Sequence, residues 1–187
     1  MTETAQQDVV DVLSTDHAEF LDLIQQIKAS TDPTERRDLA DTLIAELVRH
    51  SVAEEMFVYP AMSDHLPNGK EAVEHDTAEH KELERTMKEL EKTDANDPEF
   101  LSVVGVLENV LRDHVSDEEG EQFPQLRAHL SREQLVELAG KVETAKKLAP
   151  TRPHPLSPNN QLFHKTVGAG VGLVDRLRDK LTGRNQD

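Results

Sequence analysis

The chain has 187 residues, no cysteine and a formal net charge of −16 at pH 7. Its length fits one domain with a substantial core, and without thiolates any metal must bind to histidine and carboxylate side chains. The acidic charge argues against a nucleic-acid partner, because a phosphate backbone would be repelled. No apolar segment is long enough to span a membrane and none resembles a signal peptide, so we expect a cytoplasmic protein.

Hydrophobic residues recur with helical period along most of the chain. They predict helices over about 7–30, from Pro33 to near Tyr59-Pro60, over about 70–93, from Asp97-Pro98 onward, and over about 131–148. Asp32 and the capping box that opens at Ser131 mark two of the starts. Four long helices with short connections favour an all-α, up-down-up-down four-helix bundle, with a fifth helix beside it.

The last part of the chain differs from the rest in composition. We assign 1–149 to the bundle with its fifth helix, and 150–187 to a proline-rich linker followed by a short amphipathic C-terminal helix. The apolar stripe of this helix is flanked by basic residues, so it could dock on its own bundle, on a partner subunit or on a membrane surface. We favour docking on protein, which would allow an oligomer.

Two segments share one pattern, His-x-x-x-Glu-Glu-x-x-x-aromatic-Pro. The first runs from His50 to Pro60 with Glu54 as its first glutamate, and the second runs from His114 to Pro124 with Glu118 in that place. Four residues are just over one helical turn, so each histidine and its glutamate lie about 40° apart on one helix face. Two helices that present such pairs inward would supply half of a two-metal site.

Two further histidines, His17 and His80, lie in the apolar stripes of the other two bundle helices. Alone, a buried histidine is commonly satisfied by a polar neighbour. Buried glutamates are costly unless they are paired or bind a metal, and six such residues in one core favour a convergent site. Imidazole and carboxylate suit iron, manganese or zinc, and two carboxylates favour a pair of metals. The Glu-x-x-His order of ferritin-like bundles is absent.

The order of these residues resembles the hemerythrin-like (HHE cation-binding) family over roughly residues 8–128. The matching elements are His17, His50-x-x-x-Glu54-Glu, Glu79-His80 and His114-x-x-x-Glu118. The resemblance implies a hemerythrin-type bundle that holds two iron ions as an oxo- or hydroxo-bridged di-iron centre. In that case Glu54 and Glu118 bridge the irons, His17 and His50 bind one, and His114 with a third-helix histidine binds the other.

The third helix departs from the oxygen carriers of that family, which have two histidines four residues apart. Here His75 and His80 are five apart, about 140° on a regular α-helix. A π-bulge would realign them. Otherwise His75 lies on the surface and the second iron has an open or substituted position, which favours reactions with peroxide or nitric oxide over reversible oxygen binding. The candidate metal ligands are His17, His50, Glu54, His75, His80, His114 and Glu118.

Three other residues of the repeated pattern are not among the candidate ligands. Glu55 and Glu119 each follow a candidate ligand by one position, so we expect them to point away as solvated residues, with a supporting role at the site as the alternative. For Tyr59 we favour packing at a helix end over a hydrogen bond into the site.

Three functions fit these features. The chain could decompose peroxide at a di-iron centre, bind or sense oxygen or nitric oxide without turnover, or take part in iron storage and homeostasis. We favour a role in stress defence against a small oxidant or gas, with peroxide decomposition slightly ahead.

Overall fold

The computed structural model describes residues 6–152, and every regular element in this range is helical. α1 spans Val9–Ala29 and α4 spans Gly69–Lys92. α2 (Pro33–Ala53) continues through a π-helical turn, η1 (Glu54–Val58), into α3 (Tyr59–His65). α5 (Phe100–Asp117) continues in the same way through η2 (Glu118–Gln122) into α6 (Phe123–His129), and α7 (Arg132–Leu148) follows.

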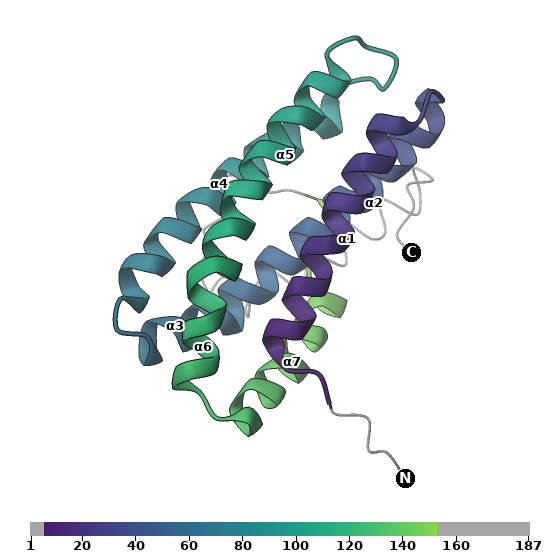
Figure 1. Ribbon diagram of the computed structural model, residues 1–187. Coiled ribbons are helices and arrows are strands. Elements are labelled where there is room, and N and C mark those ends of the chain that lie inside the picture. The colour runs from purple at the N-terminus through teal and green to yellow at the C-terminus, as the bar shows by residue number, and fades with distance from the viewer. Residues whose placement is uncertain (1–5, 153–187) are drawn as a thin grey trace.

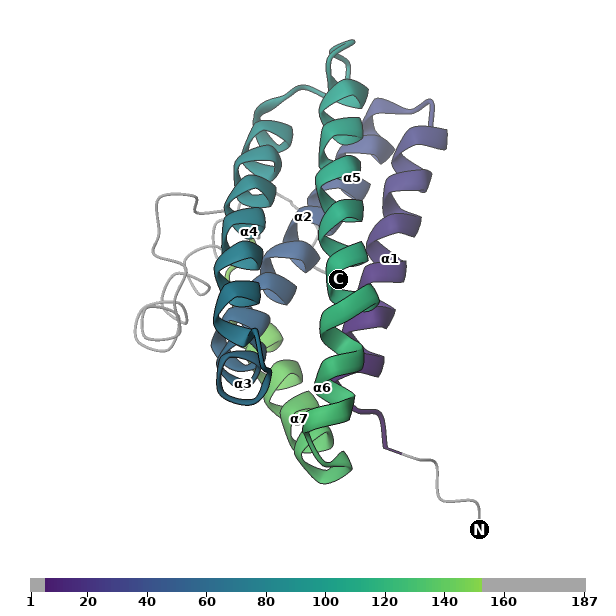
Figure 2. The same cartoon turned by 60° about the vertical axis from the view of Figure 1, so that its left-hand side comes forward.

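The predicted four-helix bundle with a fifth helix is confirmed. α1, α2, α4 and α5 run alongside one another in alternating directions (Figure 1), and α7 lies across one end, in contact with α1, α2 and η1. Figure 2 shows α3, α6 and α7 gathered at that end. No helix in residues 6–152 is long and apolar enough to cross a membrane. The predicted linker and C-terminal helix fall almost entirely outside the described residues, so the division at 149 stays a prediction.

The helix starts agree in part with the sequence. Asp32 caps α2 by accepting from the Thr34 backbone N–H, and Ser131 and Gln134 form the predicted capping box of α7. The predicted start of the fourth helix at Asp97-Pro98 was too early, because α5 begins at Phe100. There the Asp97 carboxylate accepts from the Glu99 N–H and stabilises the turn that precedes the helix.

The second helix was predicted to stop near Tyr59-Pro60, and that end was wrong. Each π turn ends two residues before a proline, Pro60 or Pro124, which lies in the first turn of the helix that follows. A proline ring inside a regular α-helix clashes with the preceding turn and removes a hydrogen bond. The wider π turn takes up this disruption, so each rod continues past its proline.

The core consists of two apolar clusters. One contains Phe20, Leu47 and Leu111, and the other, nearer α7, contains Leu13 and Phe123. The candidate ligands lie between them in the chain, since His17 stands between Leu13 and Phe20 and His114 between Leu111 and Phe123. A polar layer therefore divides the core of the bundle.

Asp8 ties the start of α1 to the end of the bundle near α7. It caps α1 through the Asp11 N–H, is 1% exposed, and accepts from Arg127 and Arg132. Burial alone would raise the pKa of Asp8, but the bonds from Arg127 and the Asp11 N–H outweigh it and lower the pKa.

Asp8→Ala should therefore lower the free energy of unfolding by about 1–2 kcal/mol for the lost cap, and further for the two arginines left without it. The matched control is Asp32→Ala, which removes an exposed cap alone. Urea denaturation followed by circular dichroism measures both. An equal loss in the two variants would contradict the role assigned to the arginine contacts.

Candidate metal centre

Six of the predicted ligands converge in the polar layer of the bundle. The Nε2 atoms of His17 and His50 are 3.2 Å apart, and these histidines group with Glu54 and Glu118. Glu54 also groups with His80 and His114. All six side chains are at most 2% exposed.

The two glutamates occupy the centre of this cluster, each within reach of two imidazoles. The Glu54 carboxylate oxygens lie 3.2 Å from His50 Nε2 and 3.4 Å from His80 Nε2. Those of Glu118 lie 3.3 Å from His17 Nε2 and 3.5 Å from His114 Nε2.

Five inward atoms of the cluster lack a hydrogen-bond partner. Neither oxygen of Glu54 or Glu118 has a hydrogen-bond partner, and neither has His114 Nε2. Unpartnered buried carboxylates are strongly unfavourable in a protein core. Nitrogen and oxygen donors about 3 Å apart suit a common ion at about 2.1 Å from each. The residues therefore fit metal ions.

Each of the four histidines is held from behind by a carboxylate at its other ring nitrogen. The Nδ1 atoms contact Glu119, Asp16, Glu55 and Glu79 at 2.8, 3.0, 2.9 and 2.9 Å for His17, His50, His80 and His114 respectively. A carboxylate at Nδ1 fixes the tautomer in which Nδ1 carries the proton and Nε2 offers its lone pair. All four Nε2 atoms are thus prepared as metal ligands.

These contacts repeat between two halves of the bundle, the first made of α1, α2 and η1 and the second of α4, α5 and η2. The acid before each α1 or α4 histidine holds the next histidine of its own half: Asp16 holds His50, and Glu79 holds His114. The acid after each central glutamate reaches across instead: Glu55 holds His80, and Glu119 holds His17. The site has approximate two-fold symmetry.

Glu55 and Glu119 were expected to point away from the site, and both expectations were wrong. Each is the second residue of a π turn that begins at the central glutamate. A π turn holds more residues than an α-turn, so consecutive side chains diverge less and both glutamates reach inward. Glu55 is buried, whereas the Glu119 side chain is 41% exposed at the rim.

The cluster is strongly coupled electrostatically. Burial would lower the pKa of His50, but Glu54 and Asp16 outweigh burial and raise it to about 9. Burial likewise opposes the rise in the pKa of His80, which Glu54 and Glu55 cause. The pKa of Glu54 is held well below its usual value by His50 and His80 despite burial. Positive charge beside the Glu54 carboxylate is therefore favourable.

A family comparison agrees with this geometry, since the model of the hemerythrin HHE cation-binding domain matches residues 8–126. The chain belongs to this family.

Two curated relatives extend the comparison. A hemerythrin-like protein of Schizosaccharomyces pombe is 32% identical over 174 residues, which cover 92% of this chain and 86% of the relative. A DNA nickase of Nostoc is 28% identical over 163 residues, which cover 87% of this chain but 43% of the relative. The matched region thus covers less than half of the nickase.

One solved structure shows the same fold. A hemerythrin HHE cation-binding domain protein from Mycobacterium kansasii has a TM-score of 0.65 and 24% identity, over 75% of this chain and 86% of its own. This similarity shows the fold. The metal-binding role is supported by the match to the cation-binding domain and by the buried His/Glu cluster.

His75 does not join the cluster. α4 is a regular α-helix, without the π-bulge that would bring His75 into phase with His80. The His75 side chain is 58% exposed and lies 3.1 Å from Asp117 and 3.4 Å from Glu79. The prediction that His75 joins the other candidate ligands is therefore wrong.

Tyr59 reaches the site, contrary to the preferred assignment to helix-end packing alone. Its hydroxyl is 2.9 Å from His80 Nε2, and its ring lies against the His80 ring with centroids 5.2 Å apart. Burial and the nearby carboxylates, Glu54 first, raise the pKa of Tyr59 well above its usual value, so the phenol stays protonated.

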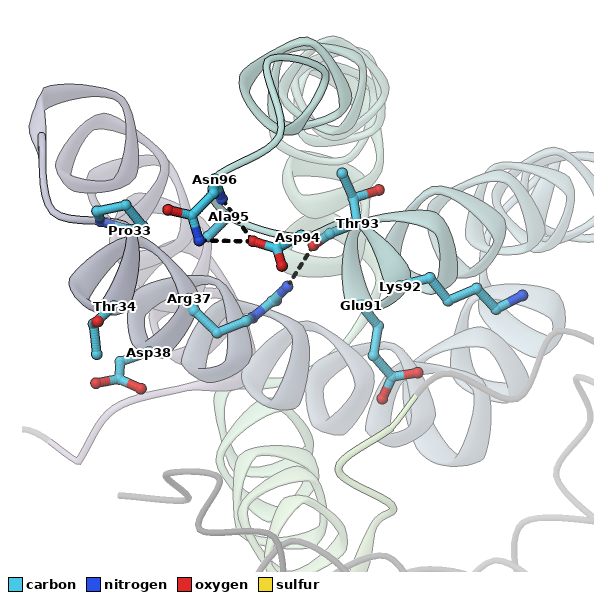
Figure 3. A pocket seen from close by; sticks show the side chains of 10 residues that line it. All are labelled: Pro33, Thr34, Arg37, Asp38, Glu91, Lys92, Thr93, Asp94, Ala95 and Asn96. Atoms are coloured by element: carbon cyan, nitrogen blue, oxygen red, sulfur yellow. Dashed lines mark hydrogen bonds between the residues drawn. The ribbon is translucent and has the colours of Figure 1, made fainter.

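A surface pocket lies at the opposite end of the bundle, where α2 begins and the chain passes from α4 to α5 (Figure 3). Arg37 crosses it to donate to the carbonyls of Leu90 and Thr93. None of the clustered ligands lines this pocket.

The carboxylates behind the histidines can be tested one at a time. Glu55→Ala should lower the affinity for Zn²⁺ about 10- to 100-fold, because His80 loses the partner that orients its ring. Competition with a chelating dye measures the affinity, and Glu71→Ala, an exposed change at the start of α4, is the control. Equal affinity in both variants would show that Glu55 does not support the site.

Proposed function

We propose that the hemerythrin domain binds two iron ions as a non-haem di-iron centre and decomposes peroxide in defence against oxidative stress. The observation that carries this proposal is the pair of buried, unpartnered carboxylates, Glu54 and Glu118, each facing two imidazoles. Carboxylates placed in this way suit bridging between two ions.

The proposed ligands divide into two sets. His17 and His50 would hold one iron, His80 and His114 the other, and both glutamates would be shared. Imidazole and carboxylate donors without thiolates suit iron, and the resemblance to hemerythrins favours iron over zinc or manganese. When bound, the iron pair supplies two-electron redox chemistry.

Residues of the chain define the surroundings of a small oxidant. Phe123 stacks on His17 with centroids 5.8 Å apart, and Phe20 lies edge-on to His50 at 5.1 Å, so apolar rings exclude water on that side. On the other side the Tyr59 hydroxyl is a neutral hydrogen-bond donor beside His80. A polar donor in a buried site favours an oxygen-containing ligand.

We prefer peroxide over reversible oxygen binding because α4 brings one histidine, His80, into the cluster, whereas the oxygen carriers of the family have two histidines on that helix. The second position therefore lacks the further imidazole that the oxygen carriers of the family have there, and its donor set differs from the one that binds oxygen reversibly. Binding or sensing of oxygen or nitric oxide without turnover is the second candidate, which the same donor set supports. We do not extend nicking activity to this chain, because its charge of −16 opposes approach to DNA.

The test is oxygen evolution from added hydrogen peroxide by the iron-loaded protein. We expect steady evolution that His50→Ala abolishes, because one iron loses a ligand. His65→Ala, an exposed histidine at the end of α3, should keep the wild-type rate. A reversible oxygenated spectrum with no turnover would contradict peroxide decomposition and support the carrier or sensor.

A further inference from the structure

Each half of the site supplies two histidines and one glutamate, but the residues around these groups differ between the halves. Tyr59 and Phe123 each stand five residues after a central glutamate, and each packs on a histidine of the opposite half. The former is polar and the latter is not. The surroundings of His80 and His114 are therefore the more polar of the two.

A larger difference between the halves lies one helical turn before His17 in α1 and before His80 in α4. The residue four positions before His17 is Leu13, which is buried in the apolar core. The residue four positions before His80 is Asp76, which is 0% exposed. A buried carboxylate at this position is unfavourable unless it has a partner, so it calls for a function.

The hydrogen bonding of Asp76 follows the same rule as that of the histidines. Its Oδ1 accepts from Gln122 Nε2 at 2.8 Å, whereas its Oδ2 has no hydrogen-bond partner. One atom is held by a polar neighbour and the other is unpartnered, as in His114, whose Nδ1 is held by Glu79. Gln122 stands at the position that Val58 occupies in the first half, so the holding group is also specific to this side.

The spacing places Asp76 on the inner face of α4. Asp76 and His80 are four residues apart on a regular α-helix, the separation that carries both His50 and Glu54 into the cluster. Donor atoms of Asp76, His114 and Glu79 lie within 4.8 Å of one another. Asp76 thus stands beside His114, one of the two histidines of the second metal position, on the helix where His75 is out of phase.

We propose that Asp76 supplies an additional carboxylate oxygen to the metal held by His80 and His114, which makes the two metal positions chemically different. This inference rests on the proposed di-iron function. The first position is held by two imidazoles and the shared glutamates, and the second gains a further anionic oxygen donor. A hard anionic ligand binds iron more tightly and favours its higher charge state.

The test compares iron retention in the full chain with changes at position 76. Asp76→Leu copies the residue of the other half, and Asp76→Asn keeps the size without the charge. Asp76→His restores a donor with the four-residue spacing of oxygen carriers. Each protein is loaded anaerobically with ferrous iron alone, and release to a chromophoric ferrous chelator is followed over time.

We expect wild type and Asp76→His to hold two irons per chain, and Asp76→Leu and Asp76→Asn to release one of the two at least about 10-fold faster. Glu82→Gln, an exposed change on α4, should behave as wild type. Without metal, Asp76→Leu should melt at or above the wild-type temperature by circular dichroism, because it removes a buried carboxylate. If Asp76→Leu releases iron rapidly and yet melts at or above the wild-type temperature, the loss of iron does not come from a folding defect.

Unchanged release of both irons from Asp76→Leu and Asp76→Asn, beside a wild-type protein with two irons, would overturn the role of Asp76 alone. A wild-type protein that holds no iron would overturn the proposed function and this inference with it.

Discussion

The structure depends on the burial of two carboxylates, Glu54 and Glu118, at the centre of a helical bundle. Removing an ionised carboxylate from water costs several kcal/mol even after the protein relaxes, and these two accept no hydrogen bond, so the imidazoles that face them are the groups that offset this cost. Four imidazoles face them, and the pKa of His50, raised to about 9, shows how strongly the site attracts positive charge. Bound metal ions would supply further positive charge, and the two apolar clusters on either side would keep such ions away from water.

The remaining features of the site hold these groups in place. Each imidazole is fixed through Nδ1 by a carboxylate, and the two π turns bring a second acid inward beside each central glutamate. Because Glu55 and Glu119 hold histidines of the opposite half, the halves of the bundle are joined through the ligands themselves. A change in the packing of the halves would therefore disturb both metal positions together.

The sequence predicted the bundle and the clustering of six histidine and glutamate side chains because both follow from helical periodicity, which places residues four apart on one face. It did not predict the inward turn of Glu55 and Glu119, which depends on a π turn. The repeated Glu-Glu-x-x-x-aromatic-Pro was the available signal, since a proline within an apolar rod requires an irregular turn. Asp76 was also missed, although it stands four residues before His80 and so shares its face. The pairing of Asp16 with His50 depends on how two helices pack, which periodicity does not specify.

The central claim is that the buried cluster holds a pair of irons. Metal analysis of the purified protein, combined with its absorption spectrum, tests this claim most directly. We expect two irons per chain, with the near-ultraviolet bands of an oxo-bridged pair. One zinc per chain, with no such bands, would contradict it.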